Sequence, residues 1–323
     1  MKYVYLLSVV LVSSVHLFGQ SSDQNYKKTV TYLQGSSTII SNPQAHQANI
    51  SIQYLDGLGR PFQEILNQFS PNRNDLVMPL EYDGLGRLLK EYLPYESSQS
   101  NGNYVSNWKA SHSSFYSALK GDAQGYSTKV YEASPLNRLI KQGSPGAAWQ
   151  PNQDLSVKMD KVVYYNYELN TASDQVLNWD IEFTSDGFIS IGYYLPVQLT
   201  KTITTDEEGH AVIEFVDKLG QTILKRVQAV ESPNMTTYTP GEWADTYYIY
   251  DNFGDLRYVL PPEAIKAIGS PSTFPYAPSP TLLDNWAFQY QYDGRRRMIE
   301  KKVPGAEPVK MIYDNRDRLV LTQ

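Results

Sequence analysis

Apolar and polar residues alternate with a period of two in several stretches of the chain. In the segment 50–54, two isoleucines and a tyrosine fall on one side, whereas Ser51 and Gln53 fall on the other. The segment 286–292 likewise places Trp286, Phe288 and two tyrosines on one side. This period is typical of β-strands with one buried face. We therefore expect a protein rich in strands.

A short unit recurs after such stretches, written as Tyr-Asp-x-x-Gly-Arg or a close variant. Aspartate in the first position of a turn can accept hydrogen bonds from backbone N–H groups, and glycine in the fourth position accepts a positive φ. A turn of this kind closes a β-hairpin. The predicted structural turn residues are Asp56, Gly59, Asp83, Gly86, Asp217, Gly220, Asp251, Gly254, Asp293 and Asp314.

The last two copies differ at the fourth turn position, where they carry Arg296 and Asp317 in place of glycine. A residue with a Cβ atom resists positive φ, arginine more than aspartate. We therefore expect these two turns to take another form.

Two segments have a different pattern. From 105 to 119, Trp108, Tyr116 and Leu119 lie near helical spacing, and Gly121 follows as a stop signal, which predicts one short helix. The segment 269–280 contains four prolines and is expected to be a surface loop between two hairpins.

The recurring unit resembles the YD repeat of bacterial RHS proteins. Four further segments of this sequence support the resemblance: Tyr92-Leu93-Pro94-Tyr95, Pro135-Leu136-Asn137-Arg138, Val259-Leu260-Pro261-Pro262 and Lys301-Lys302-Val303-Pro304-Gly305. In that family, YD hairpins join into a long sheet that spirals into a closed shell, which commonly encloses a C-terminal effector, often a toxin.

The resemblance implies a mainly β fold, with antiparallel YD-type hairpins in an extended, curved or spiralling sheet. It implies that the chain is the N-terminal part of a longer protein, with downstream RHS repeats and a C-terminal effector as partners. We expect an N-terminal domain at 20–165, with two YD-like hairpins and the helix, and a YD-repeat sheet at 166–323.

The first nineteen residues have the features of a cleavable secretory signal. Lys2 provides a short positive region, residues 3–18 are mostly apolar, and small Gly19 precedes a polar stretch. The apolar run is shorter than the ~20 residues that a spanning helix needs. We expect cleavage after Gly19, no membrane span in the mature chain, and a secreted or cell-surface location.

Composition narrows the range of functions. The formal net charge is -6, which argues against a nucleic-acid partner because phosphate binding needs a clustered basic surface. The chain has no cysteine, which removes disulfides, thiolate metal sites and a cysteine nucleophile. It has 26 tyrosines, a residue that favours half-buried strand faces.

Candidate catalytic or metal-binding residues form no recognisable pattern. His46, His112 and His210 lack zinc-type spacing, and the segment 206–209 (Asp-Glu-Glu-Gly) lacks the alternating ligands of a calcium loop, so a solvated turn is the favoured interpretation there. The repeated Asp and Arg residues recur too regularly for one active site. Turn capping by Asp and a surface or cross-strand role for Arg explain them better.

We therefore expect no catalytic residue, no metal site and no cofactor. The favoured function is a non-enzymatic structural scaffold, the N-terminal part of an RHS/YD-repeat shell. The alternative is a surface module whose aromatic faces bind a cell-surface glycan, peptide or protein; an exposed aromatic face at 286–292 would favour it.

Overall fold

A computed structural model of the chain describes residues 21, 23–33, 35, 40, 43–154, 160–181 and 187–323. These residues form a mainly β protein, with a large antiparallel sheet of eighteen strands, a separate two-stranded hairpin and a few short helices. The predicted fold class is therefore confirmed. The expected signal segment, 1–19, lies outside the described residues.

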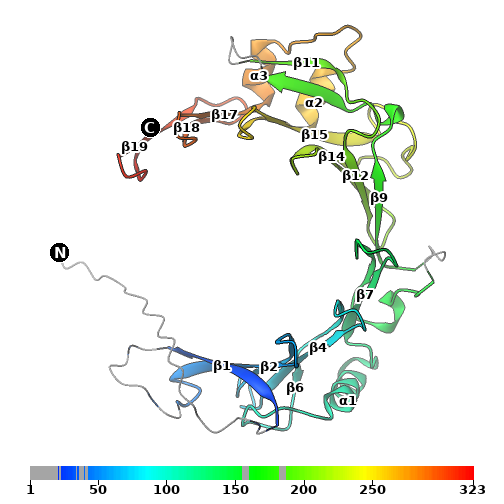
Figure 1. The fold of residues 1–323 in the computed structure, drawn as a ribbon, viewed down its shortest axis with the longest axis vertical. Helices are drawn as coiled ribbons and strands as arrows, with labels where there is room; N and C mark the ends of the chain where they lie inside the picture. The colour runs from blue at the N-terminus through cyan, green and yellow to red at the C-terminus, as the bar shows by residue number, and fades with distance from the viewer. Residues whose placement is uncertain are drawn as a thin grey trace. The chain divides into compact units, whose positions relative to one another are not determined.

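The described residues divide into two compact units (Figure 1). The first comprises the described residues of 21–130 together with 143–154, and the second comprises 131–142 together with the described residues of 160–323. The expected boundary between 165 and 166 falls inside strand β9 of the second unit.

The first unit is a meander of antiparallel strands. β1 pairs with β2, β2 with β3 and β3 with β4, while β4 also pairs with β5 and β6, and β5 pairs with β7. Its elements are β1 (Asn25–Tyr32), β2 (Ala48–Leu55), β3 (Pro61–Leu66), β4 (Leu76–Tyr82), β5 (Leu88–Tyr92), β6 (Tyr95–Glu96), α1 (Trp108–Lys120), β7 (Tyr126–Tyr131, whose last residue belongs to the second unit) and the short 3-10 helix η1 (Ala147–Trp149).

Alternation along β2 produces the core of this unit as expected. Ile52 and Tyr54 are fully buried, and they pack with Ile65 from β3 and Val77 from β4. Helix α1 covers this core near β6. The helix begins three residues later and ends one residue later than predicted. It ends because Gly121 adopts a left-handed conformation (φ 71°) and donates its N–H to the carbonyl of Ser117.

In the second unit the strands again pair mostly in chain order, from β8 and β9 to β12 and onward to β20. Its strands are β8 (Leu139–Gly143, whose last residue belongs to the first unit), β9 (Val163–Leu169), β10 (Leu177–Ile181), β11 (Phe188–Tyr193), β12 (Thr200–Thr205), β13 (Ala211–Val216), β14 (Thr222–Gln228), β15 (Trp243–Tyr250), β16 (Leu256–Leu260), β17 (Phe288–Tyr292), β18 (Met298–Lys302), β19 (Val309–Tyr313) and β20 (Leu319–Thr322). Its helices are η2 (Ala172–Asp174), α2 (Pro262–Ile268) and α3 (Pro280–Trp286).

The core of the second unit lies between this sheet and the elements that cover it. Hairpin β10–β11 and helix α2 lie beside β15, and helix α3 packs on α2 (Figure 1). Trp179 and Phe188 of the hairpin and Ala264 of α2 are buried with Phe215 and Tyr247 of the sheet. None of the helices in the described part of the chain has the length and apolarity needed to span a bilayer.

Helices α2 and α3 were not predicted from the sequence. Both begin with proline at the first helical position, where its missing N–H has no intrahelical partner. Helix α3 starts at Pro280, the last residue of the expected loop, and ends at Trp286. Trp286 is therefore not part of the strand we predicted, which begins only at Phe288.

Candidate functional site: the aspartate turns and the contacts between them

Each hairpin turn that begins with aspartate has the same hydrogen-bond pattern. At Asp56, the backbone N–H donates to the carbonyl of Arg60 (2.9 Å), and the carbonyl accepts from the N–H of Gly59 (3.0 Å). Its carboxylate Oδ1 accepts from the N–H groups of Leu58 and Arg60 (2.9 and 3.0 Å). The side chain thus satisfies backbone donors that the turn leaves without a partner. The same pattern occurs at Asp56, Asp83, Asp206, Asp217, Asp251, Asp293 and Asp314.

The turn at Asp206 was not recognised as a copy of the repeat in the sequence. Its N–H bonds the carbonyl of His210, and Gly209 has φ 91°, as in the other copies. Thr205 and His210 replace the usual tyrosine and arginine, which hid the match. The signal that could have revealed it is the Asp-x-x-Gly spacing itself.

The fourth position of every such turn is left-handed. Gly59, Gly86, Gly220 and Gly254 have φ between 79° and 82°. Arg296 and Asp317 adopt the same conformation, with φ 62° and 61°. The expectation that these two turns take another form is therefore wrong. The backbone bonds made by Asp293 and Asp314 keep the turn unchanged, and neighbouring side chains interact with the two substituted residues.

The arginine that closes many of these turns, four residues after the aspartate, has a more specific role than the surface or cross-strand one that we expected. Arg60 Nε donates to Oδ2 of Asp56 at 2.8 Å, and Nη2 lies 2.7 Å from the same oxygen. Backbone and side-chain hydrogen bonds from Arg60 lower the pKa of Asp56. Arg87, Arg297 and Arg318 bind their own turn aspartates in the same way.

Two of these arginines, Arg60 and Arg297, also contact the following hairpin. The guanidinium of Arg60 lies over the ring of Tyr82, 4.6 Å from its centroid, and the Tyr82 hydroxyl donates to the carbonyl of Pro61 at 2.8 Å. Arg297 repeats the arrangement: it lies 4.9 Å from the ring centroid of Tyr313, whose hydroxyl donates to the carbonyl of Met298 at 2.8 Å. The tyrosine of one repeat thus packs on the arginine of the preceding repeat, through cation–π and hydrogen-bond contacts.

A looser version of this contact joins the β7–β8 turn to β9. There Glu132 takes the place of aspartate and binds Arg138 through Oε1 and Oε2 (2.9 and 2.8 Å). Arg138 lies 4.7 Å from the ring centroid of Tyr167, whose hydroxyl donates to the carbonyl of Leu139 at 3.0 Å. The side-chain hydrogen bond from Arg138 lowers the pKa of Glu132 to about 2.

A second contact joins the residue that closes one turn to the left-handed residue of a following turn. A Cβ atom on Gly86 would collide with the guanidinium of Arg60, and one on Gly254 would come within 3.0 Å of Gln221 Nε2. Glycine therefore leaves room for the neighbouring side chain.

Where glycine is absent, the same two positions carry opposite charges. Arg296 Nη2 lies 2.7 Å from Oδ1 of Asp255, the closing residue of the Asp251 turn. Arg297 Nη1 lies 2.7 Å from Oδ1 of Asp317 in the next turn. Close approach or charge pairing thus connects neighbouring turns.

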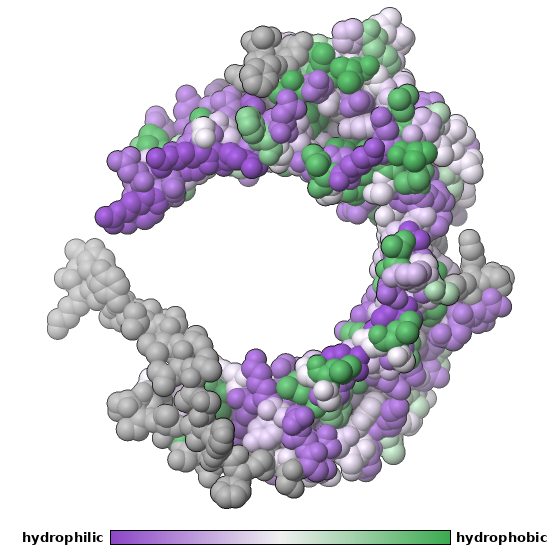
Figure 2. Space-filling view, viewed as in Figure 1, coloured by the Kyte–Doolittle hydropathy of each residue, from purple (hydrophilic) through white to green (hydrophobic). Residues whose placement is uncertain are grey.

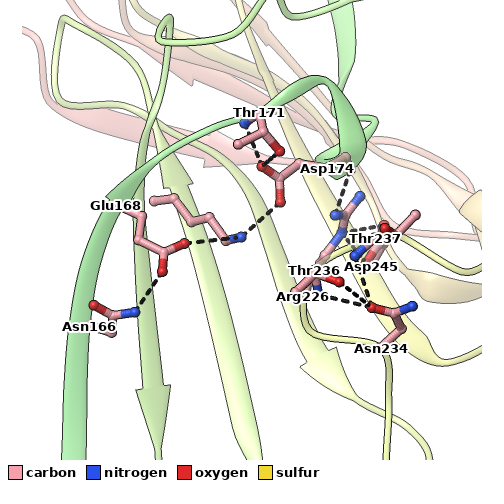
Figure 3. A network of polar contacts seen from close by, with 10 residues as sticks. Asn166, Glu168, Thr171, Asp174, Arg226, Asn234, Thr236, Thr237 and Asp245 are labelled. Carbon is pink, nitrogen blue, oxygen red and sulfur yellow. Dashed lines mark hydrogen bonds and ion pairs between the residues drawn. The ribbon is translucent and has the colours of Figure 1, made fainter.

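A buried polar network fixes the covering elements on the sheet of the second unit (Figure 3). Lys201 Nζ of β12 lies 2.9 Å from Oδ1 of Asp174 on η2, and both side chains are buried. Arg226 of β14 pairs with Asp245 of β15, and its Nη1 donates to the Asp174 carbonyl at 2.7 Å. Burial raises the pKa of Asp245, an effect that Arg226 opposes. A buried pair of this kind is costly to break and favours one docking geometry.

The chemistry available around this network is limited. Tyr238, Asp245 and Tyr247 line a cavity of about 20 Å³, room for about one water molecule. His112 lies buried among the rings of Tyr92, Tyr95 and Tyr116, where burial lowers its pKa. Within the described ranges, no three His, Cys, Asp or Glu side chains gather in a way that could hold a metal ion.

The chain thus contains repeated aspartate turns whose side chains join neighbouring hairpins. Residues 28–163 match a family model described as a domain of unknown function, DUF6443. No curated protein matches the chain.

Two solved structures contain similar chains, both at 17% identity and a TM-score of 0.47. One is described as a crystal structure of TcdB2-TccC3-Cdc42 and the other as a mutant Tc holotoxin pore of Photorhabdus luminescens. The matches cover 85% and 86% of this chain but only 11% of each of those chains. At this level of similarity the fold class rests on the strand pairings of the chain itself.

Proposed function

We propose that this protein is a non-enzymatic structural scaffold, the N-terminal part of an RHS/YD-type β-sheet shell. The observation that supports the proposal is the contact between repeats, in which Arg60 packs on Tyr82 and Arg297 packs on Tyr313. These contacts use the residues that define the repeat to hold successive hairpins together. A residue that recurs for packing serves the whole sheet, whereas catalysis requires one local constellation.

The proposed partners follow from the resemblance to RHS proteins. They are further YD repeats and a C-terminal effector, which the completed sheet would enclose or present. Export through the segment 1–19 would place the assembly on the cell surface or outside the cell. N-terminal sequencing of exported protein should find a mature chain that begins at Gln20; a chain that retains residues 3–18 would contradict export by cleavage.

Affinity purification from the native bacterium tests the scaffold proposal. Purification of a tagged copy of the natural gene product should recover YD-repeat polypeptide in stoichiometric amount, either as part of the same chain or as a second chain bound to it. A parallel screen for hydrolase, transferase and nuclease activity should show only background. Turnover that is lost in Asp251→Ala, in a variant shown by circular dichroism to be folded, would contradict a purely structural role.

The alternative, a glycan- or peptide-binding surface, depended on an exposed aromatic row at 286–292. Trp286 is 41% exposed but lies on helix α3, and Phe288, Tyr290 and Tyr292 on β17 are only partly exposed. These four side chains therefore do not form one exposed strand face. Binding of the purified chain to a glycan array would favour this alternative over the scaffold.

A further inference from the structure

The outer edge of strand β20 has no strand partner among the described residues. β20 pairs with β19, with Tyr313 opposite Leu319, Ile312 opposite Leu321 and Met311 opposite Thr322. Leu319, Val320 and Leu321 are 51%, 59% and 52% exposed. Figure 2 shows that the visible face of the C-terminal strands β17–β20 is mainly hydrophilic.

Strand register identifies the equivalent positions in earlier hairpins. Pro61 lies opposite Leu55, Met298 opposite Tyr292 and Leu319 opposite Tyr313, each directly after a shift in the strand pairing. The carbonyl groups of Pro61 and Met298 accept the hydroxyl of the next repeat's tyrosine. Leu319 therefore occupies the position whose carbonyl would accept such a hydroxyl.

Arg318 occupies the position of Arg60 and Arg297. In all three arginines, Nε and Nη2 bind the aspartate of their own turn. Nη1 of Arg60 then faces Gly86, and Nη1 of Arg297 binds Asp317. The side chain of Arg318 is 68% exposed, and within the described part of the chain its Nη1 has no partner.

We propose that Arg318 and the β20 edge form a docking site for one further β-hairpin with the sequence Tyr-Asp-x-x-Gly or Tyr-Asp-x-x-Asp. The tyrosine ring would lie on the Arg318 guanidinium and donate its hydroxyl to the Leu319 carbonyl. The fourth turn residue would face Arg318 Nη1, where glycine leaves room and an acidic side chain forms an ion pair. A basic residue at that position would be disfavoured by like-charge repulsion.

This inference rests on the proposed scaffold function, because the occupant is a further YD hairpin. Strand β1 of a second copy of the chain would not provide such a hairpin. Its β1 pairs only with β2 among the described residues, and the segment 33–47 that connects them contains no Tyr-Asp pair. A homodimer in which β20 of one copy pairs with β1 of the other would give Arg318 neither a tyrosine ring nor a fourth turn residue to contact.

The test uses the full chain with a second copy of residues 303–323 joined after Gln323, which preserves the 21-residue spacing from Asp293 to Asp314. Hydrogen exchange of the backbone amides of Leu319–Thr322 is followed by mass spectrometry. In the extended chain we expect the amides that face the free edge, those of Val320 and Thr322, to exchange about tenfold more slowly than in the parent chain, because the strand edge becomes paired. Glycine at the fourth turn position of the added hairpin should give the same protection.

Arginine at that position should lower the protection measurably, because it places like charges together. Combining it with Arg318→Asp should recover the part of the protection lost to like-charge repulsion, because this combination reproduces the natural Asp255–Arg296 pair, although it removes the guanidinium on which the tyrosine ring would lie. Equal exchange in the parent and extended chains would overturn the proposal. Protection that does not depend on the residue at the fourth turn position would also overturn it. A parent chain that is dimeric by light scattering, with β20 already protected, would also overturn it. None of these readouts involves export or an effector, so failure here is distinguishable from failure of the scaffold function.

Discussion

In two pairs of neighbouring turns, the side chain that closes one turn contacts the left-handed residue of the next turn in different ways. In the first unit, the turns at Asp56 and Asp83 meet where Gly86 leaves space for the guanidinium of Arg60. In the second, the turns at Asp293 and Asp314 meet where Asp317 accepts an ion pair from Arg297. The left-handed residues have φ 81° and 61°, so the backbone is of the same kind in both.

The comparison shows what glycine contributes to this repeat. Glycine removes both the backbone strain of positive φ and the collision with the neighbouring arginine. A charged residue retains the strain, of roughly 1–2 kcal/mol, and offsets part of it with a contact to the next turn. The aspartate at the first position is common to both pairs and holds the turn in each case.

Acid should weaken both pairs together, and this is the largest effect we expect because the turn aspartates of both pairs have lowered pKa values. Hydrogen bonds from the closing arginine lower the pKa of Asp56 and of Asp314, and lower that of Glu132 to about 2. A lowered folded-state pKa gives stability that is complete above the unfolded-state value, about 4. That stability is lost as the pH falls through the folded-state pKa values.

Thermal unfolding between pH 7 and pH 2 measures this dependence. We expect little change in Tm down to about pH 5 and a progressive decrease below about pH 4. A Tm that does not decrease below pH 4 would show that the turn carboxylates contribute no stability. Exchange of Asp314 for asparagine, which keeps an acceptor oxygen, should reduce the dependence.

Among single substitutions, we expect Gly86→Val, in the pair of turns that uses glycine, to cause the largest loss in the free energy of unfolding. Valine at φ 81° is strained, and its side chain would displace the Arg60 guanidinium, so we expect a loss of roughly 2 kcal/mol in the free energy of unfolding. Gly84→Val is the matched control, because Gly84 lacks positive φ and has open space around it. Equal stability of the two variants in denaturant titrations would contradict the packing of Arg60 on Gly86.

Tyr82→Phe should cost less, about 1 kcal/mol, because it removes only the hydrogen bond to the Pro61 carbonyl and keeps the ring beneath Arg60. Tyr313→Phe is the corresponding change in the charged pair, and we expect a similar cost. Chemical denaturation compares the two variants. A loss in one but not in the other would mean that the tyrosine contact is not a general feature of the repeat.

The smallest effect is expected from exchanging charges at Asp255 and Arg296. Asp255→Arg and Arg296→Asp should each lower Tm by about 2 °C, because each places like charges together on a partly exposed surface. The double variant should recover most of the loss, and high salt should reduce all three differences. Additive losses in the double variant would show that the two side chains do not interact.

Some of this protein could be predicted because it depends on residues close together in the chain. Alternation in 50–54 predicted a buried strand face, since side chains point to opposite sides of a strand. The Asp-x-x-Gly spacing predicted the turns, since the aspartate bonds N–H groups two and four residues later. Helix α1 and its end at Gly121 followed from local spacing and a local stop signal.

Other features required the tertiary structure, because their partners lie far apart in the sequence. The repeat motif alone does not show that Arg60 packs on Tyr82, since strand pairing brings the two together. The same holds for Asp317, whose left-handed conformation is supported by Arg297 of the preceding hairpin. Trp286 was assigned to the wrong element because the alternation along β17 continues back to Trp286, the last residue of α3.

The sequence by itself determined the strands, the turns and the residue types that define the repeat, because backbone geometry and nearby hydrogen bonds act over a few residues. The tertiary structure decided which of those residues meet across neighbouring hairpins. It also placed Asp174, Arg226 and Asp245 in one buried network, from elements up to 71 residues apart. Charges removed from water are stable only beside their partners, and strand pairing and the docking of the covering elements bring those partners together.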